Sequence, residues 1–290
     1  MGMPSDLVLV RHGESEGNVA MAAAKGGDLS LFTDAYATTP GRQWRLTDRG
    51  RQQAAAIGGW LRQEFPTTKE LGAGLDWFYA SPYVRTRETA AHLGLPGARW
   101  LLNRGLRERD WGDIGSMDTA AFRRDYPQNA RIRDMDPLYW RPPGGESIAQ
   151  VAEDRVKNVL ATLHREADGQ RVIAVNHGEM MWAFRLQLER WNDEEFLEQD
   201  RKTKIHNCHV LHYTRVDPTT RRQSARLSFV REAWPQDRSD GKWVVETTEW
   251  RPVSRRTLSN DDLLTDIADV PQLFATSATD ETAAARRADS

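Results

Sequence analysis

The sequence predicts an α/β fold of three layers, α/β/α, with helices on both faces of a mostly parallel central sheet and an inserted cap region. Two short apolar runs, Leu7–Val10 and Val172–Val175, have the continuous hydrophobicity of parallel strands that are buried on both faces. Segments with apolar residues at helical spacing lie between such runs. Strands that alternate with helices form βαβ units, which is why we expect a mostly parallel sheet.

The composition is that of an ordinary globular protein and excludes several classes of partner. The chain has 290 residues, of which 39% are hydrophobic, enough for one large α/β domain or two small ones. Its formal net charge of -2 gives no reason to expect nucleic acid or an anionic membrane as a partner. No apolar run approaches the roughly 20 residues that a membrane span needs. The oligomeric state stays open.

The single cysteine and the N-terminus suggest a location. With Cys208 alone, no intramolecular disulfide forms, which fits a reducing cytosol. The segment Met1–Asp6 leads directly into a strand and lacks the charged start and apolar stretch of a signal peptide. We therefore expect a cytoplasmic protein.

The first half of the chain alternates strands and helices around one long irregular segment. Val19–Arg45 shows no sustained periodicity and is predicted to be a loop with one short helix. Thr47 is predicted to cap a helix, because Ala54, Ile57 and Leu61 follow it at helical spacing. The next elements are a strand, a helix and a short strand, predicted at Asp76–Ala80, Val84–Leu93 and Ala98–Leu102.

The second half begins with a proline-containing insertion. Gly112–Gly145 is irregular and is predicted to form the cap, with one or two short helices. Ser147 and Gln150 form a capping box that starts a long amphipathic helix. A buried strand and a core helix are predicted next, followed by late strands that include an edge hairpin; these elements lie at Arg171–Asn176, Met180–Leu188, Cys208–Tyr213, Ala225–Val230 and Trp243–Trp250.

We expect two parts in the chain. Residues 1–252 would form one domain with the cap inserted at about 112–145, and residues 253–290 would form a tail rich in Ser, Thr, Ala and Asp. Within the tail, Asn260–Phe274 has apolar residues at helical spacing and is predicted to be a short helix that docks on the core.

Polar residues follow each predicted parallel strand. In open parallel sheets, ligands bind beyond the carboxyl ends of the strands, so residues at these positions meet at one edge. The residues that follow the four strands are Arg11, His12 and Gly13; Ser81 and Arg85; Arg104, Arg107 and Glu108; and His177 and Gly178. Two histidines, several arginines and a carboxylate are thus predicted to converge.

This set of side chains suits phosphoryl transfer. Arginine presents a planar fork of donors that matches phosphate oxygens. A neutral imidazole is a good nucleophile near pH 7, and a carboxylic acid with a raised pKa can protonate a leaving oxygen. Such chemistry needs neither a metal ion nor another cofactor. The sequence has no G-x-x-x-x-G-K-[ST] loop, which argues against a P-loop nucleotide enzyme.

The motifs resemble those of a known family. Arg11–Asn18 reads Arg-His-Gly-Glu-Ser-Glu-Gly-Asn and resembles the R-H-G-E-[ST]-x-x-N signature of the histidine phosphatase superfamily, which includes cofactor-dependent phosphoglycerate mutases. Further blocks follow in the family's order, at Leu46–Ala54, Ser81–Ala90, Leu106–Gly112, Gly144–Ser147 and Val175–Gly178. The resemblance spans roughly Leu7–Leu188 and implies the three-layer fold and a phosphohistidine intermediate.

The resemblance also implies roles for individual residues. His12 would carry the phosphoryl group, and Glu108 would donate the proton to the leaving group, although Glu146, Asp110 and Asp113 are further carboxyl groups nearby. Phosphate oxygens would be held by Arg11, Arg85 and His177, with Asn18 as a further phosphate contact and Ser15 on the substrate side. Independently of the resemblance, their positions in the sequence make the backbone N–H groups at Gly178 and the side chain of Arg109 candidates for substrate contact.

The branch of the family is indicated by departures from the mutase pattern. The mutases have N-E-R-H-Y-G and H-G-N-S-L-R where this chain has Arg107–Gly112 and His177–Trp182. The block Leu-Arg-Glu-x-Asp-aromatic-Gly looks more like that of plant and fungal phosphoglycerate mutase-like proteins regarded as phosphatases. We therefore predict a metal-independent phosphatase acting on a small phosphorylated substrate. The alternatives are a mutase-type phosphotransferase and a non-catalytic module that binds a phosphorylated ligand.

Two questions are not decided by the residues. Small sugar phosphates, nucleotides and phosphopeptides are all compatible with the motifs as substrates. His206, His209 and His212 raise the question of a metal site, but a strand would send His209 and His212 to opposite faces, so no metal is expected there.

Overall fold

The structure is a computed structural model that describes residues 2–66, 74–238, 240–255 and 257–272. Eight strands form one sheet in the order β3-β2-β4-β1-β5-β6-β7, with β8 paired to β6. The four strands at one side are parallel to one another: β3 (Trp100–Leu102), β2 (Trp77–Ala80), β4 (Arg171–Asn176) and β1 (Asp6–Arg11). The predicted α/β class is confirmed, and this parallel part of the sheet lies where the sequence placed it.

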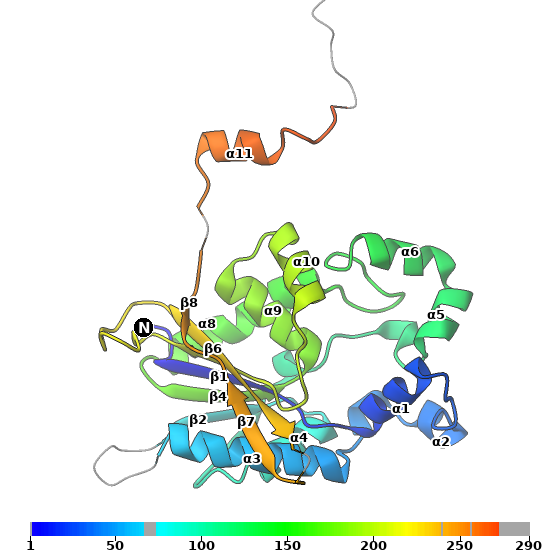
Figure 1. Cartoon of the computed structure of the whole chain (residues 1–290), viewed down its shortest axis with the longest axis horizontal. Coiled ribbons are helices and arrows are strands. Elements are labelled where there is room, and N and C mark those ends of the chain that lie inside the picture. Colours follow the sequence, from blue (N-terminus) through cyan, green and yellow to red (C-terminus); the bar gives the residue numbers. More distant parts are fainter. Residues whose placement is uncertain (1, 67–73, 239, 256, 273–290) are drawn as a thin grey trace, which may run out of the picture. The chain divides into compact units, whose positions relative to one another are not determined.

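Alternating side chains of β1 supply the two faces of the sheet. Leu7 and Leu9 join one buried cluster, whereas Val8 and Val10 join another on the opposite face. The first face is covered by α8 (Lys157–Glu166) and α9 (Gly178–Glu189). The second is covered by α3 (Asp48–Glu64) and α4 (Val84–His92), as Figure 1 shows. These helices complete the three layers.

Helix α3 begins at the predicted cap and passes very close to α4. The hydroxyl oxygen of Thr47 accepts a hydrogen bond of 3.0 Å from the backbone N–H of Gly50. A Cβ atom added at Gly58 would lie 1.9 Å from the backbone oxygen of Leu93. The absence of a side chain at Gly58 therefore lets the two segments approach closely and brings α4, with Arg85 in its first turn, under the sheet edge.

One long helical stretch follows the capping box of Ser147 and Gln150, which is present as predicted. It comprises α7 (Ile148–Gln150), the π-helical segment η4 (Val151–Val156) and α8. Within η4, Arg155 donates a hydrogen bond of 2.8 Å to the backbone oxygen of Arg107 and pairs with Glu146 at 3.0 Å. The π-helical turn thus holds the backbone next to Glu108 in place.

The prediction of a loop with one short helix over Val19–Arg45 is only partly right, because the segment holds more helix than expected. The segment begins within α1 (Glu16–Lys25) and continues through α2 (Asp34–Thr38) and the 3₁₀ turn η1 (Gly41–Gln43). Ser15 and Asn18 form a capping box at the start of α1. The run of alanines behind them has high intrinsic helix propensity but no apolar periodicity, which is why the pattern of hydrophobic residues did not indicate a helix.

The segment predicted to be an inserted cap begins at the short turn η3 (Gly112–Ile114), a few residues after the turn η2 (Arg104–Leu106). Two helices follow, α5 (Thr119–Asp125) and α6 (Pro127–Met135). Ile114, Phe122, Ala130 and Trp140 form a hydrophobic cluster separate from the two that cover the sheet. These residues, which we call the 114–140 cluster, give the segment a small core of its own. Its function as a cap stays a prediction.

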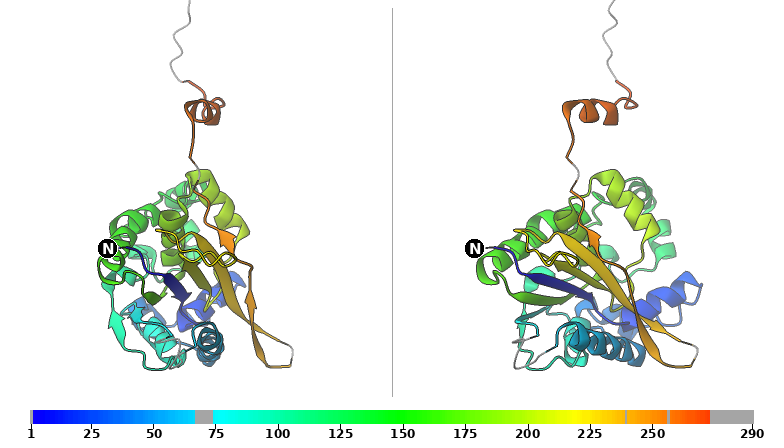
Figure 2. Two further views of the ribbon diagram at one scale, coloured as in Figure 1. Left: turned by 90° about the vertical axis from the view of Figure 1, so that its left-hand side faces the viewer. Right: turned by 60° about the vertical axis from the view of Figure 1, so that its left-hand side comes forward.

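The other side of the sheet is antiparallel. β5 (Val210–Thr214) pairs with β1 and with β6 (Phe229–Asp237), and β6 pairs with β7 (Trp243–Thr247) and β8 (Arg251–Pro252). In both views of Figure 2, β6 and β7 run side by side as a hairpin at the edge of the sheet. The late strands were predicted, although β6 begins later and runs further than Ala225–Val230. The edge hairpin was expected from Cys208–Tyr213 and Ala225–Val230; the corresponding strands β5 and β6 do pair, but β6 and β7 form the edge.

The chain divides into two compact units, Met1–Arg255 and Arg256–Ser290. In the second unit, α11 covers Asn260–Asp266, which is shorter than the helix predicted over Asn260–Phe274. Phe274 lies outside the described residues, and docking of this helix stays a prediction. None of the helices in the described part of the chain has the length and apolar character that crossing a bilayer requires.

Candidate active site

The carboxyl ends of β1 and β4 bring two histidines together. Arg11 pairs with Asn176 in the parallel register, so the next residues, His12 and His177, leave the sheet side by side. Both side chains are buried, and their ring centroids lie 5.3 Å apart. The loop after β2 leads into α4, which carries Arg85 to the same place.

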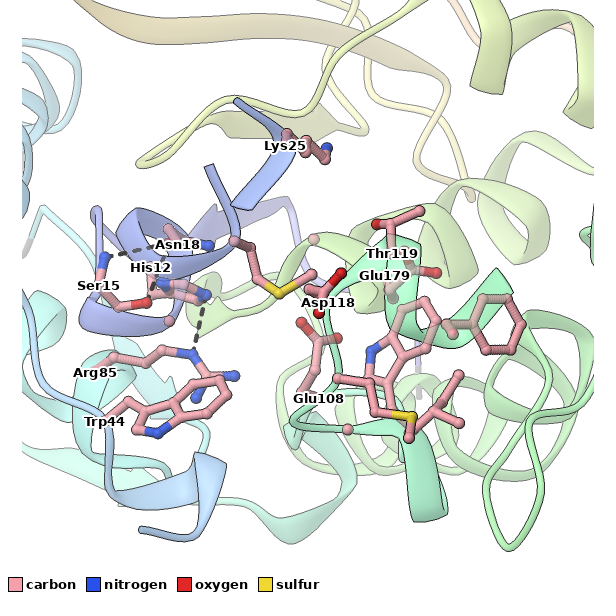
Figure 3. Close-up of a pocket in the computed structure, with 18 of the residues that line it drawn as sticks. His12, Ser15, Asn18, Lys25, Trp44, Arg85, Glu108, Asp118, Thr119 and Glu179 are labelled. Carbon is pink, nitrogen blue, oxygen red and sulfur yellow. Dashed lines mark hydrogen bonds between the residues drawn. The ribbon is translucent and has the colours of Figure 1, made fainter. Parts of the chain in front are cut away.

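A cavity of about 370 Å³ opens in front of His12. In Figure 3, His12, Ser15, Asn18, Arg85 and Trp44 lie on one side of it, and Glu108, Asp118, Thr119 and Glu179 lie on the other. Of the predicted site residues, those that line it are Arg11, His12, Ser15, Asn18, Arg85, Glu108 and Gly178. His177 is not part of the lining and lies behind Arg85, to which it is hydrogen-bonded.

Hydrogen bonds define the tautomer of His12. Its Nδ1 lies 2.7 Å from the backbone oxygen of Gly13, an acceptor, so Nδ1 carries the proton and Nε2 keeps its lone pair. Burial lowers the pKa of His12 well below its usual value, and the positive charges of Arg85 and Arg11 lower it further. His12 is therefore a neutral imidazole whose Nε2 is available as a nucleophile.

Arg85 connects the two histidines. Its Nε donates to Nε2 of His12 at 3.1 Å, and a second guanidinium nitrogen donates to Nδ1 of His177 at 3.1 Å. The third nitrogen donates to the backbone oxygen of Gly41 at 2.7 Å. Because Gly41 belongs to η1, the segment before α3 helps to fix the guanidinium at the sheet edge.

His177 is a neutral imidazole of defined orientation. Since its Nδ1 accepts from Arg85, its Nε2 carries the proton and donates to the hydroxyl oxygen of Ser81 at 2.9 Å. Burial, followed by the nearby charge of Arg85, lowers the pKa of His177 well below its usual value. The ring of Tyr83 packs against it edge-on at 5.0 Å.

In the guanidinium of Arg11, a terminal nitrogen is hydrogen-bonded to the backbone, whereas Nε has no partner among the described residues. A terminal nitrogen donates to the backbone oxygen of Ile205 at 2.6 Å, while the buried Nε has no hydrogen-bond partner among the described residues. A Cβ atom added at Gly178 would lie 3.4 Å from this Nε. The glycine therefore leaves the approach to Nε open for an anion.

Glu108 has the pKa of an acid that can act near neutral pH. Burial raises the pKa of Glu108 to about 7, although Arg85 opposes this shift. One carboxyl oxygen accepts from the backbone N–H of Arg109 at 3.0 Å, and the other lies 3.9 Å from Nδ1 of His177. A ligand atom of Glu108 lies within 4.8 Å of those of His12 and His177.

The other three candidate carboxyl groups do not line the cavity. Glu146 is held by Arg107 at 2.9 Å and by Arg155 at 3.0 Å. Asp110 and Asp113 are exposed on the surface. Among the four carboxyl groups considered from the sequence, only Glu108 faces the cavity with His12.

Asn18 and Ser15 fix the start of α1 beside His12. The side-chain oxygen of Asn18 accepts hydrogen bonds from the backbone N–H and the hydroxyl of Ser15, at 3.2 and 3.1 Å. It also accepts one from Asn207 at 3.0 Å, and the same Asn207 amide lies 3.3 Å from the backbone oxygen of His12. The oxygen of Asn18 is thus occupied, and its amide nitrogen is the atom left to meet a phosphate.

Arg109 is buried outside the cavity, contrary to the expectation that it contacts substrate. Its Nε donates to the backbone oxygen of Glu146 at 2.7 Å, and its terminal nitrogens donate to Trp140 at 3.0 Å and Glu179 at 3.2 Å. Its guanidinium also lies over the ring of Trp111, 4.6 Å from the centroid. Since each nitrogen has a partner, Arg109 has a structural role.

Several supporting residues lie within the motifs but were given no role from the sequence. Gly13 and Gly50 bring their backbones together, because a Cβ atom at Gly13 would lie 2.4 Å from the backbone oxygen of Gly50. Thr89 accepts from the N–H of Gly13 at 3.0 Å, and Gln53 accepts from the N–H of Glu14 at 2.8 Å. The loop that carries His12 is therefore clamped by α3 and α4.

Another group of lining residues was missed because no motif marks them. Met21 and Trp44 come from the segment predicted as a loop, and Trp111, Ile114, Met117, Phe122 and Arg133 come from the segment before and within the predicted cap. The positions of these residues depend on how both segments fold over the sheet edge, which local sequence patterns do not encode. Asn207 was also missed, because it lies in a late turn without a motif.

The described residues contain one grouping of metal-type ligands, His12, Glu108 and His177. It does not suit a cation, because Arg85 donates to the very ring nitrogens that a metal would need, and Arg11 adds a second positive charge. His209 and His212 are engaged separately, with Glu232 and Asp6, each at 2.9 Å. The guanidinium groups of Arg11 and Arg85 instead favour an anion in the cavity, next to a neutral imidazole and a carboxyl group.

The chain resembles proteins of one family. Residues 7–225 match the sequence profile of the histidine phosphatase superfamily (branch 1). The phosphoglycerate mutase-like protein AT74 of Arabidopsis thaliana is 32% identical over 207 residues, covering 67% of this chain but only 60% of that protein. A 2,3-bisphosphoglycerate-dependent phosphoglycerate mutase of Methylobacterium radiotolerans is 33% identical over 197 residues, which cover 63% of this chain and 78% of the relative.

Solved structures share the fold at lower identity. A mycobacterial glucosyl-3-phosphoglycerate phosphatase complexed with VO3 superposes with a TM-score of 0.56 at 21% identity, covering 83% of this chain and 97% of that one. Phosphoserine phosphatase of Entamoeba histolytica, in complex with 3-phosphoglyceric acid, gives 0.53 at 20% identity, covering 72% and 89%. These likenesses establish the fold alone.

Proposed function

The chain belongs to the histidine phosphatase superfamily, and from this premise we propose that it is a metal-independent phosphatase that hydrolyses a phosphomonoester through a phosphohistidine on His12. One observation carries the proposal: a neutral His12, whose unprotonated Nε2 accepts a hydrogen bond from Arg85, lies within 4.8 Å of a carboxyl group whose pKa is about 7. Nucleophile and proton donor thus face the same cavity in the protonation states that the reaction needs.

In the first half of the reaction, the phosphate of the substrate takes the donors of Arg85 that now rest on the two imidazoles. Nε2 of His12 attacks phosphorus, the P–O bond to the alcohol breaks, and Glu108 gives its proton to the leaving oxygen. Arg85 and the free Nε of Arg11 stabilise the charge on the phosphoryl oxygens. The start of α9 at Gly178 adds backbone N–H groups and the positive end of a helix dipole.

In the second half, Glu108 is ionised and acts as the base. It takes a proton from a water molecule, whose oxygen attacks phosphorus while the P–N bond to His12 breaks. Inorganic phosphate leaves, and Glu108 regains its proton. A carboxyl group with a pKa near 7 serves both directions of proton transfer at neutral pH.

The proposal is tested by hydrolysis of 4-nitrophenyl phosphate in the presence of a chelator, by the wild type and by His12→Ala. We expect metal-free turnover by the wild type and a loss of about a thousandfold or more in the variant. A phosphoenzyme formed by the wild type and absent from the variant would identify the intermediate. Turnover retained by a folded His12→Ala protein would overturn the role of His12.

A mutase is the second candidate, because a curated relative with 33% identity is named a 2,3-bisphosphoglycerate-dependent phosphoglycerate mutase. The two candidates differ in the acceptor of the phosphoryl group. With 3-phosphoglycerate as substrate, a mutase forms 2-phosphoglycerate and requires a bisphosphorylated primer, whereas a phosphatase releases inorganic phosphate without one. Formation of 2-phosphoglycerate that depends on the primer would favour the mutase.

A further inference from the structure

The cavity has an apolar wall away from His12, although polar residues that include Lys25 and Thr119 also line it. Trp111, Ile114, Met117 and Phe122 lie along the segment that follows Glu108, and Met21 faces the cavity from α1. A volume of about 370 Å³ lies near the lower end of the range for small-molecule sites, roughly 300–1,000 Å³. The site therefore holds more than a phosphoryl group and receives a compact organic body.

One guanidinium stands among these apolar side chains. Arg133, on α6, lines the same cavity, and its Cζ lies 5.5 Å from the ring centroids of Trp111 and Trp140 and 5.8 Å from that of Phe122. Within the described ranges, Arg133 has no hydrogen bond and no ion pair within 4.0 Å. Its face rests on aromatic rings, so the donors at its edge are free for a planar acceptor such as a carboxylate.

Three acidic side chains, Glu179, Asp134 and Asp200, lie near Arg133, but within the described ranges none of them pairs with it within 4.0 Å. Asp134 is paired with Arg123 at 2.8 Å. Glu179 is paired with Arg109 at 3.2 Å. One carboxyl oxygen of Asp118 accepts hydrogen bonds from the backbone N–H groups of Ala120 and Ala121, at 2.8 and 3.0 Å. Among the residues that the structure describes, Arg133 therefore has no carboxylate in hydrogen-bonding contact, and a ligand can supply one.

We propose that the substrate is a phosphomonoester of an aromatic alcohol that also carries a carboxylate, with its ring against the apolar wall and its carboxylate on Arg133. The proposal rests on the phosphatase function proposed above and adds the class of substrate. Small polyol phosphates fit this wall poorly, because their hydroxyl groups would lose water without gaining hydrogen-bond partners.

The test measures binding rather than turnover, with non-hydrolysable phosphonates and calorimetry. The ligands are methylphosphonate, benzylphosphonate, and pairs with a carboxylate or a carboxamide at the far end of a benzyl or a biphenylmethyl group. We expect benzylphosphonate to bind at least tenfold more tightly than methylphosphonate. We also expect about a tenfold preference for carboxylate over carboxamide in at least one of the two pairs.

Three variants assign this preference to Arg133. Arg133→Gln should bind the carboxylate and the carboxamide within twofold of each other, and Arg133→Lys should retain part of the preference. Arg131→Gln removes the same charge from an exposed position of α6 outside this cavity, so its preference should equal that of the wild type. Thermal unfolding of each variant identifies any that has lost its fold, in which case Arg133→Lys provides the comparison.

Either of two results would overturn the proposal: equal affinities within both pairs for the wild type, or a preference that survives in Arg133→Gln. These binding measurements, combined with the hydrolysis assay described above, separate the proposed substrate class from the proposed function. Hydrolysis of 4-nitrophenyl phosphate without any preference for the carboxylate would leave the phosphatase and remove the substrate class. A carboxylate preference that depends on Arg133, in a protein without hydrolysis, would do the reverse.

Discussion

Nε of Arg85 lies 3.1 Å from Nε2 of His12, so the guanidinium covers the nitrogen that we propose attacks phosphorus. A second nitrogen of the same guanidinium lies 3.1 Å from Nδ1 of His177. In this arrangement Arg85 holds both imidazoles in a single tautomer and opposes their protonation. A phosphate that enters the cavity must replace these two hydrogen bonds with its own oxygens.

Replacing Arg85 tests this double role. A lysine keeps the charge but has one nitrogen where the guanidinium uses three, so we expect Arg85→Lys to lose about 10²–10³-fold in kcat/KM on an aryl phosphate. Arg85→Gln should lose more, and the pKa of His12, followed by NMR, should rise because one of its repelling charges is gone. Arg87→Lys, on the exposed side of the same helix, is the matched control. A wild-type rate in Arg85→Lys would contradict the bridging role.

Glu108→Gln removes the proposed proton donor without changing its size. The loss of kcat/KM, which reports the first half of the reaction, should be about 10²–10⁴-fold for a substrate with an alkyl alcohol, which needs a proton as it leaves. For 4-nitrophenyl phosphate, whose alcohol is a good leaving group, kcat/KM should fall much less. Values of kcat/KM for both substrates, with Asp113→Asn on the exposed surface as the control, make the comparison. An equal loss with both substrates would argue against Glu108 as the acid.

The raised pKa of Glu108 also makes the stability of the fold depend on pH. The folded protein binds this proton more tightly than the unfolded chain, because the pKa rises from 4.5 to about 7. The resulting stabilisation is present below pH 4.5 and is lost as pH rises through about 7. The difference in free energy of unfolding between Glu108→Gln and the wild type should therefore grow by about 3 kcal/mol from pH 4.5 to pH 8 in favour of the variant. Urea unfolding at both pH values checks this, and a difference independent of pH would refute it.

Two adjacent glycines of α3 should respond in opposite directions to the same substitution. A Cβ atom at Gly58 would lie 1.9 Å from the backbone oxygen of Leu93, so Gly58→Ala should lower the free energy of unfolding by at least about 2 kcal/mol. At Gly59 the nearest atom, a nitrogen of Arg62, lies 3.8 Å away, and Gly59→Ala should raise stability by about 0.5–1 kcal/mol. Denaturant unfolding of both variants measures the contrast. Equal effects would mean that α3 and α4 are not in close contact.

The sequence allowed prediction of those site residues that follow buried strands. Arg11 ends β1, His12 follows it directly, and His177 comes directly after β4, so their meeting point is set by the register of neighbouring parallel strands. Arg85 lies in the first turn of the helix after β2, a position equally fixed by local structure. For such residues, predicting the strand also predicts where in the fold the side chain lies.

The positions of residues that depend on the tertiary fold could not be predicted from the sequence. Arg109 is adjacent to Glu108 in the sequence, yet it turns away to bind Trp140 and Glu179, which no local pattern indicates. Arg133 reaches the cavity only because α6 packs over it. Helix α1 was missed for another reason, since its run of alanines has no hydrophobic periodicity.

The 114–140 cluster packs separately from the two clusters that cover the sheet. A segment with its own core can accumulate substitutions without disturbing the loops that hold the two histidines. During evolution, the same phosphate-binding residues at the sheet edge can in this way be combined with different cavity linings. Exchange of the segment then changes the substrate while the catalytic residues stay the same. For protein engineering, this makes the stretch from Gly112 to Gly145 the natural unit to graft between relatives.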